Sequence, residues 1–350
     1  MPSLSRRLLS TAVGAALAAP VLLAPPAQAA GRPFFCGHDH RATPYARYLC
    51  ARSGQMLDVR IGDVHPTQSV LGYDEVYYKL GRSTLGKDEL NHALDDWCET
   101  DGRDGVASAQ PDATLLDPSS FTCKMAVGTE TSESKAEMKT VVVGPGGQPY
   151  LTDGHHTFTS FAEDPIGGLD THIRVIVQAN YSNLTRQEFW KRMKAHKWVY
   201  LRDAQGNRIG VNKLPRQVGL AGFQNDPYRG LLYFGKKVGF QPDSVPFQEF
   251  YWGGWLRDDK PVDLSGWDRD DFDSYLATVE AITRAQVDHP KDAEVGDSGF
   301  TATELGALDE WNKGKDADKG NFGKLSRPYT DVKPGKLAYA LQYKAVHHLS

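Results

Sequence analysis

The segment VVVGPGGQPYLTDGHHTFTSFA, residues 141–162, restricts the possible folds of this chain more than any other segment. Val141–Val143 is apolar and β-branched, the four residues Gly-Pro-Gly-Gly that follow favour a turn, and Pro149–Thr152 is typical of a returning strand. Gly154 can adopt the left-handed backbone that a sharp turn from strand to helix requires. The sequence therefore predicts a β-hairpin that leads into a helix, which ends before Asp164-Pro165.

Two adjacent histidines lie where this helix is expected to begin. His155, His156 and Thr157 would form its first turn, whose amides and helix dipole favour an anion. An imidazole beside such a site can bind a phosphoryl oxygen or transfer protons to it. A capping or surface role for either histidine is the alternative interpretation. The chemical hypothesis is that Asp153 orients one imidazole while His155 or His156 acts as a general acid or base.

The first 29 residues have the pattern of a secretory signal. Arg6 and Arg7 precede an apolar stretch rich in alanine and leucine, and Ala27-Gln28-Ala29 is a typical cleavage site. The pattern fits both the twin-arginine and the general export route. No later apolar run approaches the eighteen or so residues that span a bilayer. We expect a protein outside the cytoplasm, cleaved near Ala29, with no stable membrane association.

The charge of the chain is uneven. Removing residues 1–29 changes the formal net charge from −4 to −6, since two arginines and no acid are lost, so bulk charge does not suggest a nucleic-acid-binding protein. The segment Arg186–Arg216, however, has only two acids, Glu188 and Asp203. Its basic residues are Arg186, Lys191, Arg192, Lys194, Lys197, Arg202, Arg208, Lys213 and Arg216. This segment is either a solvated surface or a patch that binds a polyanion.

The even number of cysteines in an exported chain favours disulfides. The four are Cys36, Cys50, Cys98 and Cys123, and three pairings are possible. The local pairing, Cys36 with Cys50 and Cys98 with Cys123, closes the shortest loops and is the one we expect. A zinc site is the alternative, but the spacing contains no C-x-x-C, and the sequence indicates no metal ligands elsewhere.

Apolar periodicity predicts further elements. Strands are expected at Leu57–Ile61 and Thr171–Gln178, helices at Tyr73–Leu80 and Asp88–Cys98, a turn at His65-Pro66, and a loop over residues 101–120. Thr185 and Glu188 form a capping box before a helix with an apolar face of Phe189, Trp190 and Met193. A hairpin is expected between Trp198–Leu201 and Arg208–Val211. Beyond Asp258 the chain is acidic and helical, and its last fifty residues are expected to wrap the surface rather than form a core.

Several segments together resemble the family of ParB-like nucleases, distant relatives of ParB and sulfiredoxin. They are VRIGDVHPTQSVLGYDEVYYK, the DGHHT segment, EFWKRMKAHKWVYLRDAQGNRIG, LPRQVG, NDPYRGLLYF and FQEFYWGGWLR, from about Leu57 to Arg257. The resemblance implies an α+β fold in which DGHHT takes the place of the phosphate-binding turn of ParB and the G-C-H-R turn of sulfiredoxin. It also places the loop carrying His65 and Gln68 beside DGHHT.

The turn is also similar to that of the ParB-like free-serine kinases, with two departures. Thr157 stands where the kinase turn has arginine, and Gln68 stands where those kinases have an acidic residue. These differences argue against a phosphotransferase with the same mechanism. Since the turn has no cysteine, sulfiredoxin chemistry lacks its nucleophile.

Two classes of function follow. The first is an exported phosphodiester hydrolase, expected to be a nuclease, in which Lys79 or Arg229 holds the phosphate with the helix-start amides at Gly154 and Thr157. The second is a non-catalytic module that binds a nucleotide or another anion, with a kinase-like phosphotransferase as a further alternative. The expected partner is a phosphate-containing ligand, and the sequence specifies no cofactor. The expected organisation is a signal at 1–29, a disulfide-pinned extension at 30–55, an α+β ParB/sulfiredoxin-like domain at 56–257 and a partly helical extension at 258–350.

Overall fold

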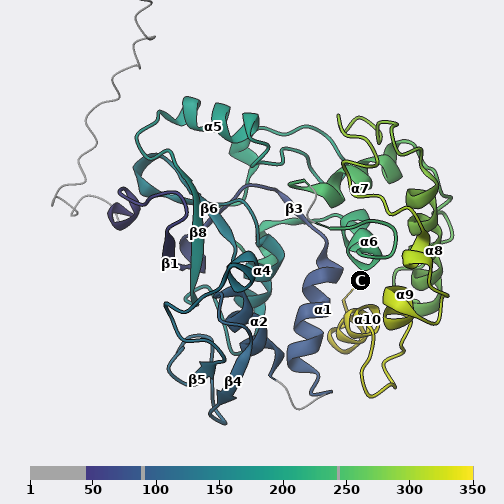
Figure 1. Cartoon of the computed structure of the whole chain (residues 1–350), viewed down its shortest axis with the longest axis horizontal. Helices are drawn as coiled ribbons and strands as arrows, with labels where there is room; N and C mark the ends of the chain where they lie inside the picture. The colour runs from purple at the N-terminus through teal and green to yellow at the C-terminus, as the bar shows by residue number, and fades with distance from the viewer. Residues whose placement is uncertain (1–44, 88–90, 243–244, 350) are drawn as a thin grey trace, which may run out of the picture. The chain divides into compact units, whose positions relative to one another are not determined.

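The computed structural model describes residues 45–87, 91–242 and 245–349, which form the α+β fold expected from the sequence (Figure 1). Its main sheet has five strands in the order β1-β8-β6-β7-β2. The strands are β1 (Met56–Arg60), β2 (His65–Pro66), β6 (Thr140–Val143), β7 (Pro149–Leu151) and β8 (His172–Asn180). The β1–β8 and β6–β7 pairs are antiparallel, whereas β6–β8 and β2–β7 are parallel.

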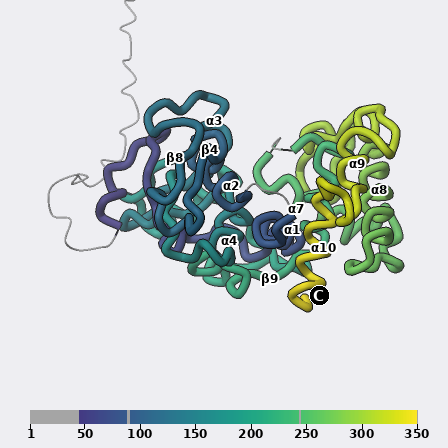
Figure 2. Tube along the Cα trace, turned by 90° about the horizontal axis from the view of Figure 1, so that it is seen from below, coloured from purple at the N-terminus to yellow at the C-terminus, as the bar shows by residue number. Residues whose placement is uncertain are grey.

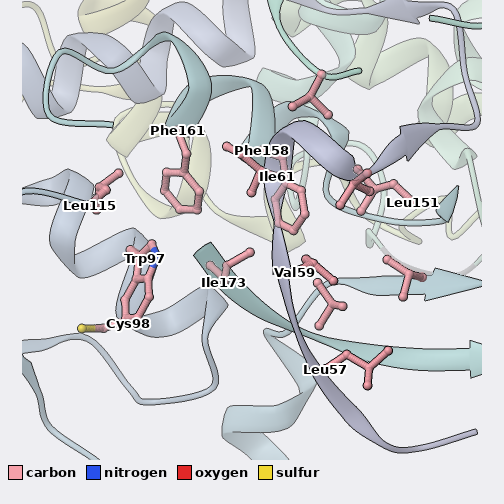
Figure 3. Close-up of a cluster of buried hydrophobic side chains, with 14 of the residues drawn as sticks. Leu57, Val59, Ile61, Trp97, Cys98, Leu115, Leu151, Phe158, Phe161 and Ile173 are labelled. Atoms are coloured by element: carbon pink, nitrogen blue, oxygen red, sulfur yellow. The ribbon is translucent and has the colours of Figure 1, made fainter. Parts of the chain in front are cut away.

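The expected hairpin and helix are confirmed. β6 and β7 pair around the glycine-rich turn, and α4 (His155–Glu163) starts directly after Gly154 and ends before Asp164. The apolar face of α4 packs on one face of the sheet together with α2 (His92–Thr100), as Figure 3 shows. The buried side chains there include Leu57, Val59, Trp97, Phe158, Phe161 and Ile173. Their burial holds the start of α4 at the edge of the sheet.

Helix α5 (Arg186–Ala195) covers the other face. The Thr185–Glu188 capping box is present, with the Glu188 amide donating to Thr185 Oγ1 over 3.3 Å and the Thr185 amide donating to Glu188 Oε2 over 3.0 Å. As predicted, Phe189, Trp190 and Met193 are buried, and they pack against Val142 and Tyr150 of the hairpin.

Helix α1 (Tyr73–Thr84) lies between the sheet region and the C-terminal helices. It contacts α2 and α4 on one side and α10 (Lys336–His347) on the other, as Figure 2 shows, and it also contacts α6 (Pro227–Gly235). The other large helices are α7 (Gln248–Asp258) and α8 (Phe272–Asp288), and α9 (Gly320–Leu325) is short.

The prediction that the last fifty residues wrap the surface is wrong. Leu305, Phe322, Leu325 and Leu337 are nearly inaccessible to solvent and share one apolar core with α6, α7 and α8. The sequence misleads because apolar residues there are spaced among many lysines, aspartates and glycines, so no long periodic stretch stands out.

Other details differ from the sequence expectations. His65-Pro66 is a short strand because it pairs with Tyr150 and Leu151, and residues 101–120 include β4 (Val106–Ala109). The expected hairpin after Trp198 is reduced to one bridge, Arg202 with Arg208, because the Tyr200 amide donates to Thr67 instead. The helix predicted at 88–98 begins at His92, and residues 88–90 lie outside the described part.

Short elements complete the fold. They are β3 (Val70–Leu71) paired with β9 (Gln224–Asn225), β5 (Phe121–Cys123) paired with β4, α3 (Ser132–Ala136), and 3₁₀ turns at Ala46–Tyr48, Ile61–Asp63, Pro145–Gly147, Val211–Lys213, Leu220–Gly222 and Trp311–Gly314.

The structure bears on two further expectations. Cys98 and Cys123 form a disulfide that ties α2 to β5, as predicted. The signal segment 1–29 and Cys36 lie outside the described residues, so cleavage near Ala29 and the Cys36–Cys50 pairing stay predictions. Within residues 45–87, 91–242 and 245–349, no helix is both long and apolar enough to cross a membrane.

Candidate functional site

A cavity of about 520 Å³ opens at the start of α4; we call it the α4 pocket. Its wall combines the β7–α4 turn with side chains from α1, α6 and α7. The residues that carry its chemistry are Gln68, Glu75, Lys139, Asp153, His155, His156, Thr157, Arg229, Lys236 and Glu249.

The backbone at Gly154 creates the helix start that faces this pocket. Gly154 has φ of +101°, as predicted from its place in the turn, and this conformation is strained for residues with a Cβ. The Phe158 amide, donating to Gly154 O over 2.8 Å, closes the first turn of the helix. The amides of His155, His156 and Thr157 precede this bond, so they have no acceptor within the helix and carry its positive dipole end.

Both imidazoles accept hydrogen bonds from the backbone. The Thr67 amide donates to Nε2 of His155, and the Gly72 amide donates to Nε2 of His156, each over 3.1 Å. An Nε2 that accepts an amide proton cannot itself carry one, so the proton of each neutral ring is on Nδ1. Neither Nδ1 has a hydrogen-bond partner among the described residues, and both histidines line the pocket. Each ring therefore carries an Nδ1–H that no described protein group accepts.

Burial keeps both rings neutral. His155 and His156 are 3% and 8% exposed, and burial lowers the pKa of each to about 3. The nearby positive charge of Arg229 lowers both values further, although Asp153 and Glu75 oppose it. At neutral pH the two histidines are thus uncharged hydrogen-bond donors.

An ionic cluster lies deeper in the pocket. Arg229 Nη1 is 2.9 Å from Glu75 Oε2, and Arg229 Nη2 is 3.5 Å from Glu249 Oε1, which also pairs with Lys236. Burial by itself raises the pKa of Glu75 and Glu249. At Glu75 the neighbouring His156, Arg229 and Lys236 outweigh burial, and at Glu249 Arg229 and Lys236 do so, which lowers both pKa values. The carboxylates are therefore ionised and hold the two cations in place.

Asp226, the capping residue of α6, sets the position of Arg229. Asp226 caps α6 by accepting from the amides of Tyr228 and Arg229 over 3.0 and 3.2 Å, and its other oxygen accepts from Arg257 over 3.0 Å. The NDPYR segment is therefore a helix start, and it places Arg229 at the pocket.

Backbones of α1 and α6 meet beside Arg229. A Cβ on Gly72 would overlap the backbone nitrogen of Gly230, so the backbone at the start of α1 and the backbone of α6 approach each other closely here. Gly72 is also the residue whose amide binds His156. The imidazole of His156 and the guanidinium of Arg229 are thus connected through two peptide backbones.

The mouth of the pocket holds a looser pair. Asp153 Oδ2 lies 3.6 Å from Lys139 Nζ, and the Asp153 side chain is 65% exposed. Among the described residues, Asp153 makes no hydrogen bond to either imidazole. The orienting role predicted for this carboxylate therefore belongs to the Thr67 and Gly72 amides.

The structure separates the residues predicted for this site. Gln68, Gly154, Thr157 and Arg229 line the pocket with the two histidines, and the Gln68 side chain donates to Val70 O over 2.6 Å. The loop of residues 65–68 does lie beside the DGHH turn, since Thr67 binds His155.

Two predicted residues lie elsewhere. His65 lines a different depression, and Lys79 points away from the pocket to pair with Asp96 over 3.2 Å. Sequence reasoning also missed charged pocket residues, among them Glu75, Lys139, Lys236 and Glu249. Glu75 gave a weak signal, as an acid within an apolar helix, whereas Lys139, Lys236 and Glu249 are brought in by distant segments. No group of three or more metal-ligating side chains occurs in the described ranges.

Fold and site together define an α+β protein with a pocket at the start of a helix that follows a β-hairpin. A family model described as "Putative ParB-like nuclease" matches residues 57–258, so the chain belongs to this family, as the resemblance implied. Among solved structures, protein Atu1540 from Agrobacterium tumefaciens is 23% identical, with a TM-score of 0.44; the match covers 66% of this chain and 91% of that one. No curated protein matches the chain.

Proposed function

We propose that the chain binds a phosphate ester in the α4 pocket and hydrolyses it, with phosphodiesters as the substrate class. One observation carries the proposal: two neutral imidazoles have Nδ1–H groups beside first-turn amides, and neither set of donors has a partner among the described residues. Such donors suit the charge that develops on phosphoryl oxygens as a phosphoester is cleaved. Membership of a family named for nuclease activity supports the same class of reaction.

The protonation states support a revised division of labour. Imidazoles with a pKa near 3 are weak bases, so we assign His155 and His156 to hydrogen bonding rather than to proton abstraction. Asp153 lines the pocket and is exposed enough to contact water. In this scheme water attacks phosphorus and gives a proton to Asp153, the ester P–O bond breaks, and the leaving oxygen takes a proton from solvent.

Paired substitutions test the role of the histidines. Gln in place of either histidine keeps an acceptor near the Nε2 position but removes the Nδ1–H, whereas Ala removes both. We expect His155→Gln and His156→Gln to keep most of the stability but to lower kcat on bis(p-nitrophenyl) phosphate about a hundredfold or more. Asp153→Asn should lower kcat by a similar factor without changing stability.

Two controls are needed to separate a loss of chemistry from a loss of folding or of a metal ion. Circular dichroism must show that each variant is folded, and the assay is repeated with added divalent metal. If the Gln variants are as active as wild type, the imidazoles serve the fold alone and the proposed chemistry is wrong.

A non-catalytic anion-binding module is the second candidate. It is favoured by the pairing of Arg229, Lys236, Glu75 and Glu249 with one another, which leaves few charged groups for chemistry. Calorimetric binding of a nucleotide without turnover of single-stranded DNA, RNA or a small phosphodiester would support this module instead.

We also infer that the protein is exported. The inference is supported by the signal pattern of residues 1–29 and by the disulfide between Cys98 and Cys123, since structural disulfides persist mainly outside the cytoplasm. N-terminal sequencing of secreted protein should find a start near Ala30. Finding intact Met1 on the secreted protein would contradict cleavage.

A further inference from the structure

A second depression, of about 490 Å³, lies beside α5; we call it the α5 depression. Its aromatic members are His65, Tyr150 and Trp190, and Arg186 and Arg216 also line it. Prolines and aliphatic side chains make up most of the rest, and its lining includes no carboxylate. None of these groups has a part in the chemistry proposed for the α4 pocket.

The aromatic rings form one connected group. The Tyr150 ring is 5.2 Å from that of His65, tilted by 34°, and 5.4 Å from that of Trp190, nearly perpendicular. His65 Nδ1 bonds to Arg216 O over 2.9 Å, and burial lowers the pKa of His65. Trp190 Nε1 and His65 Nε2 have no hydrogen-bond partner in the described chain. The group thus combines apolar ring surface with an unsatisfied donor and acceptor.

The surroundings of the depression are strongly basic. Arg186 and Arg216 are exposed, and neither has an ion-pair partner within residues 45–87, 91–242 and 245–349. Lys191, Lys194 and Lys213 are likewise exposed and unpaired there. The two acids of this segment bind their own turns: Glu188 caps α5, and Asp203 accepts from residues 205 and 207. This surface favours a polyanion, because its positive charge is not neutralised locally.

We propose that the α5 depression binds one nucleotide of a single-stranded nucleic acid, with its base against Tyr150 and its phosphate at Arg186 and Arg216. Every nucleobase has a π-face, so an aromatic floor with a basic rim suits a single strand of any sequence. A duplex hides these faces within its base stack.

The two cavities are adjacent along the chain. Tyr150 lines the α5 depression and Thr152, two residues later, lines the α4 pocket; Pro66 and Gln68 show the same relationship. Two residues of extended chain span about 7 Å, on the order of one nucleotide step. The proposal rests on the proposed function in that the strand held at α5 is the one cleaved in the α4 pocket.

Binding of a fluorescein-labelled oligothymidylate, measured by anisotropy over a salt series, tests the proposal. We expect the double variant Arg186→Gln/Arg216→Gln to bind at least about tenfold more weakly at low salt. The slope of log K against log salt should fall by about 0.7, because the protein no longer neutralises the one phosphate held by these two arginines. Arg284→Gln is the matched control, because Arg284 is an exposed arginine on α8 that pairs with Glu280.

A second measurement tests the base contact. Wild-type protein should bind the single strand more tightly than a duplex of the same length, whereas equal affinities would reject the contact with the base. Unchanged oligonucleotide binding in the double variant would overturn the whole proposal.

Hydrolysis of bis(p-nitrophenyl) phosphate separates this proposal from the proposed function. This small substrate reports on the α4 pocket alone, so the double variant should hydrolyse it at the wild-type rate. If wild type does not hydrolyse it but the oligonucleotide result holds, the α5 site stands and the proposed function fails. If hydrolysis proceeds while no oligonucleotide binds, the reverse is true.

Discussion

The α4 pocket and the α5 depression differ in how they could attract an anion. In the α4 pocket the buried cations Arg229 and Lys236 are already paired with Glu75 and Glu249, and the groups left for a ligand are neutral donors. The α5 depression has the opposite arrangement, since its arginines are exposed and unpaired. Recognition as proposed for the α4 pocket depends on the direction of hydrogen bonds, and recognition as proposed for the α5 depression depends on charge.

The contrast extends to stability. In the α4 pocket, Arg229 and Glu75 are buried, so each depends on its partner, whereas the charges around α5 remain hydrated. Changes in the pocket should therefore affect the fold, and changes at α5 should affect binding alone.

The largest expected effect is on the buried cluster. Arg229→Met leaves Glu75 and Glu249 with less compensation in the interior and should lower the free energy of unfolding by about 3–5 kcal/mol. Arg186→Gln should change it by less than about 0.5 kcal/mol. Urea unfolding followed by circular dichroism measures both. Similar values for the two variants would remove the distinction between the sites.

Acid should weaken the α4 pocket specifically. The folded-state pKa of His155 and His156, about 3, is below the unfolded value near 6.5, so each histidine stabilises the fold above pH 6.5 and loses this contribution as pH falls toward 3. Between pH 7 and pH 5 the loss should be about 2 kcal/mol per histidine.

Urea unfolding at both pH values checks this expectation. His155→Gln and His156→Gln should each lose about 2 kcal/mol of the pH dependence between pH 7 and pH 5, since one titrating ring is removed. A Gln variant with the full wild-type dependence would show that its histidine is not the titrating group.

The backbone that aims the first-turn amides is the next target. Gly154→Ala places a Cβ at φ of +101° against the Lys139 side chain, and should cost about 1–2 kcal/mol. Gly146→Ala is a matched control for positive φ, because nothing lies near a Cβ there. Thermal unfolding compares the two, and phosphoester binding should fall only in Gly154→Ala. An equal loss of binding in both would separate the Gly154 turn from the site.

The smallest expected effect is the salt dependence of the α4 pocket. Because its ligand-facing groups are neutral donors, affinity for inorganic phosphate should change with salt much less than oligonucleotide affinity does. Calorimetry over the salt range of the anisotropy series measures this. Parallel slopes would mean that exposed charge governs both sites.

Sequence patterns predicted the parts of the molecule that are formed by neighbouring residues. The β6–β7 hairpin, the positive φ of Gly154 and the α5 capping box all depend on residues close in sequence, so turn chemistry and periodicity suffice. The core around Phe322 and Leu337 was missed because its apolar residues are far apart in the sequence and come into contact only when α9 and α10 pack.

The site shows the same division. His155, His156, Gly154 and Thr157 lie in one short motif, and the resemblance added Gln68. Lys236 is at the end of α6 and Glu249 lies in α7. They belong to the site because they form an ion pair with each other, and no pattern of neighbouring residues predicts that pair. His65 and Lys79 were misplaced because a loop or helix has two sides, and sequence proximity does not specify which one faces a cavity.

The close contact between Gly72 and Gly230 holds two sides of the α4 pocket at a fixed separation. One side is the ring of His156, which accepts a hydrogen bond from the Gly72 amide. The other side is Arg229, the residue before Gly230. Because this contact is between two backbones, no change of side-chain rotamer at the contact can widen the pocket. The pocket should therefore select anions by size, accepting those that match its width rather than closing around whatever enters.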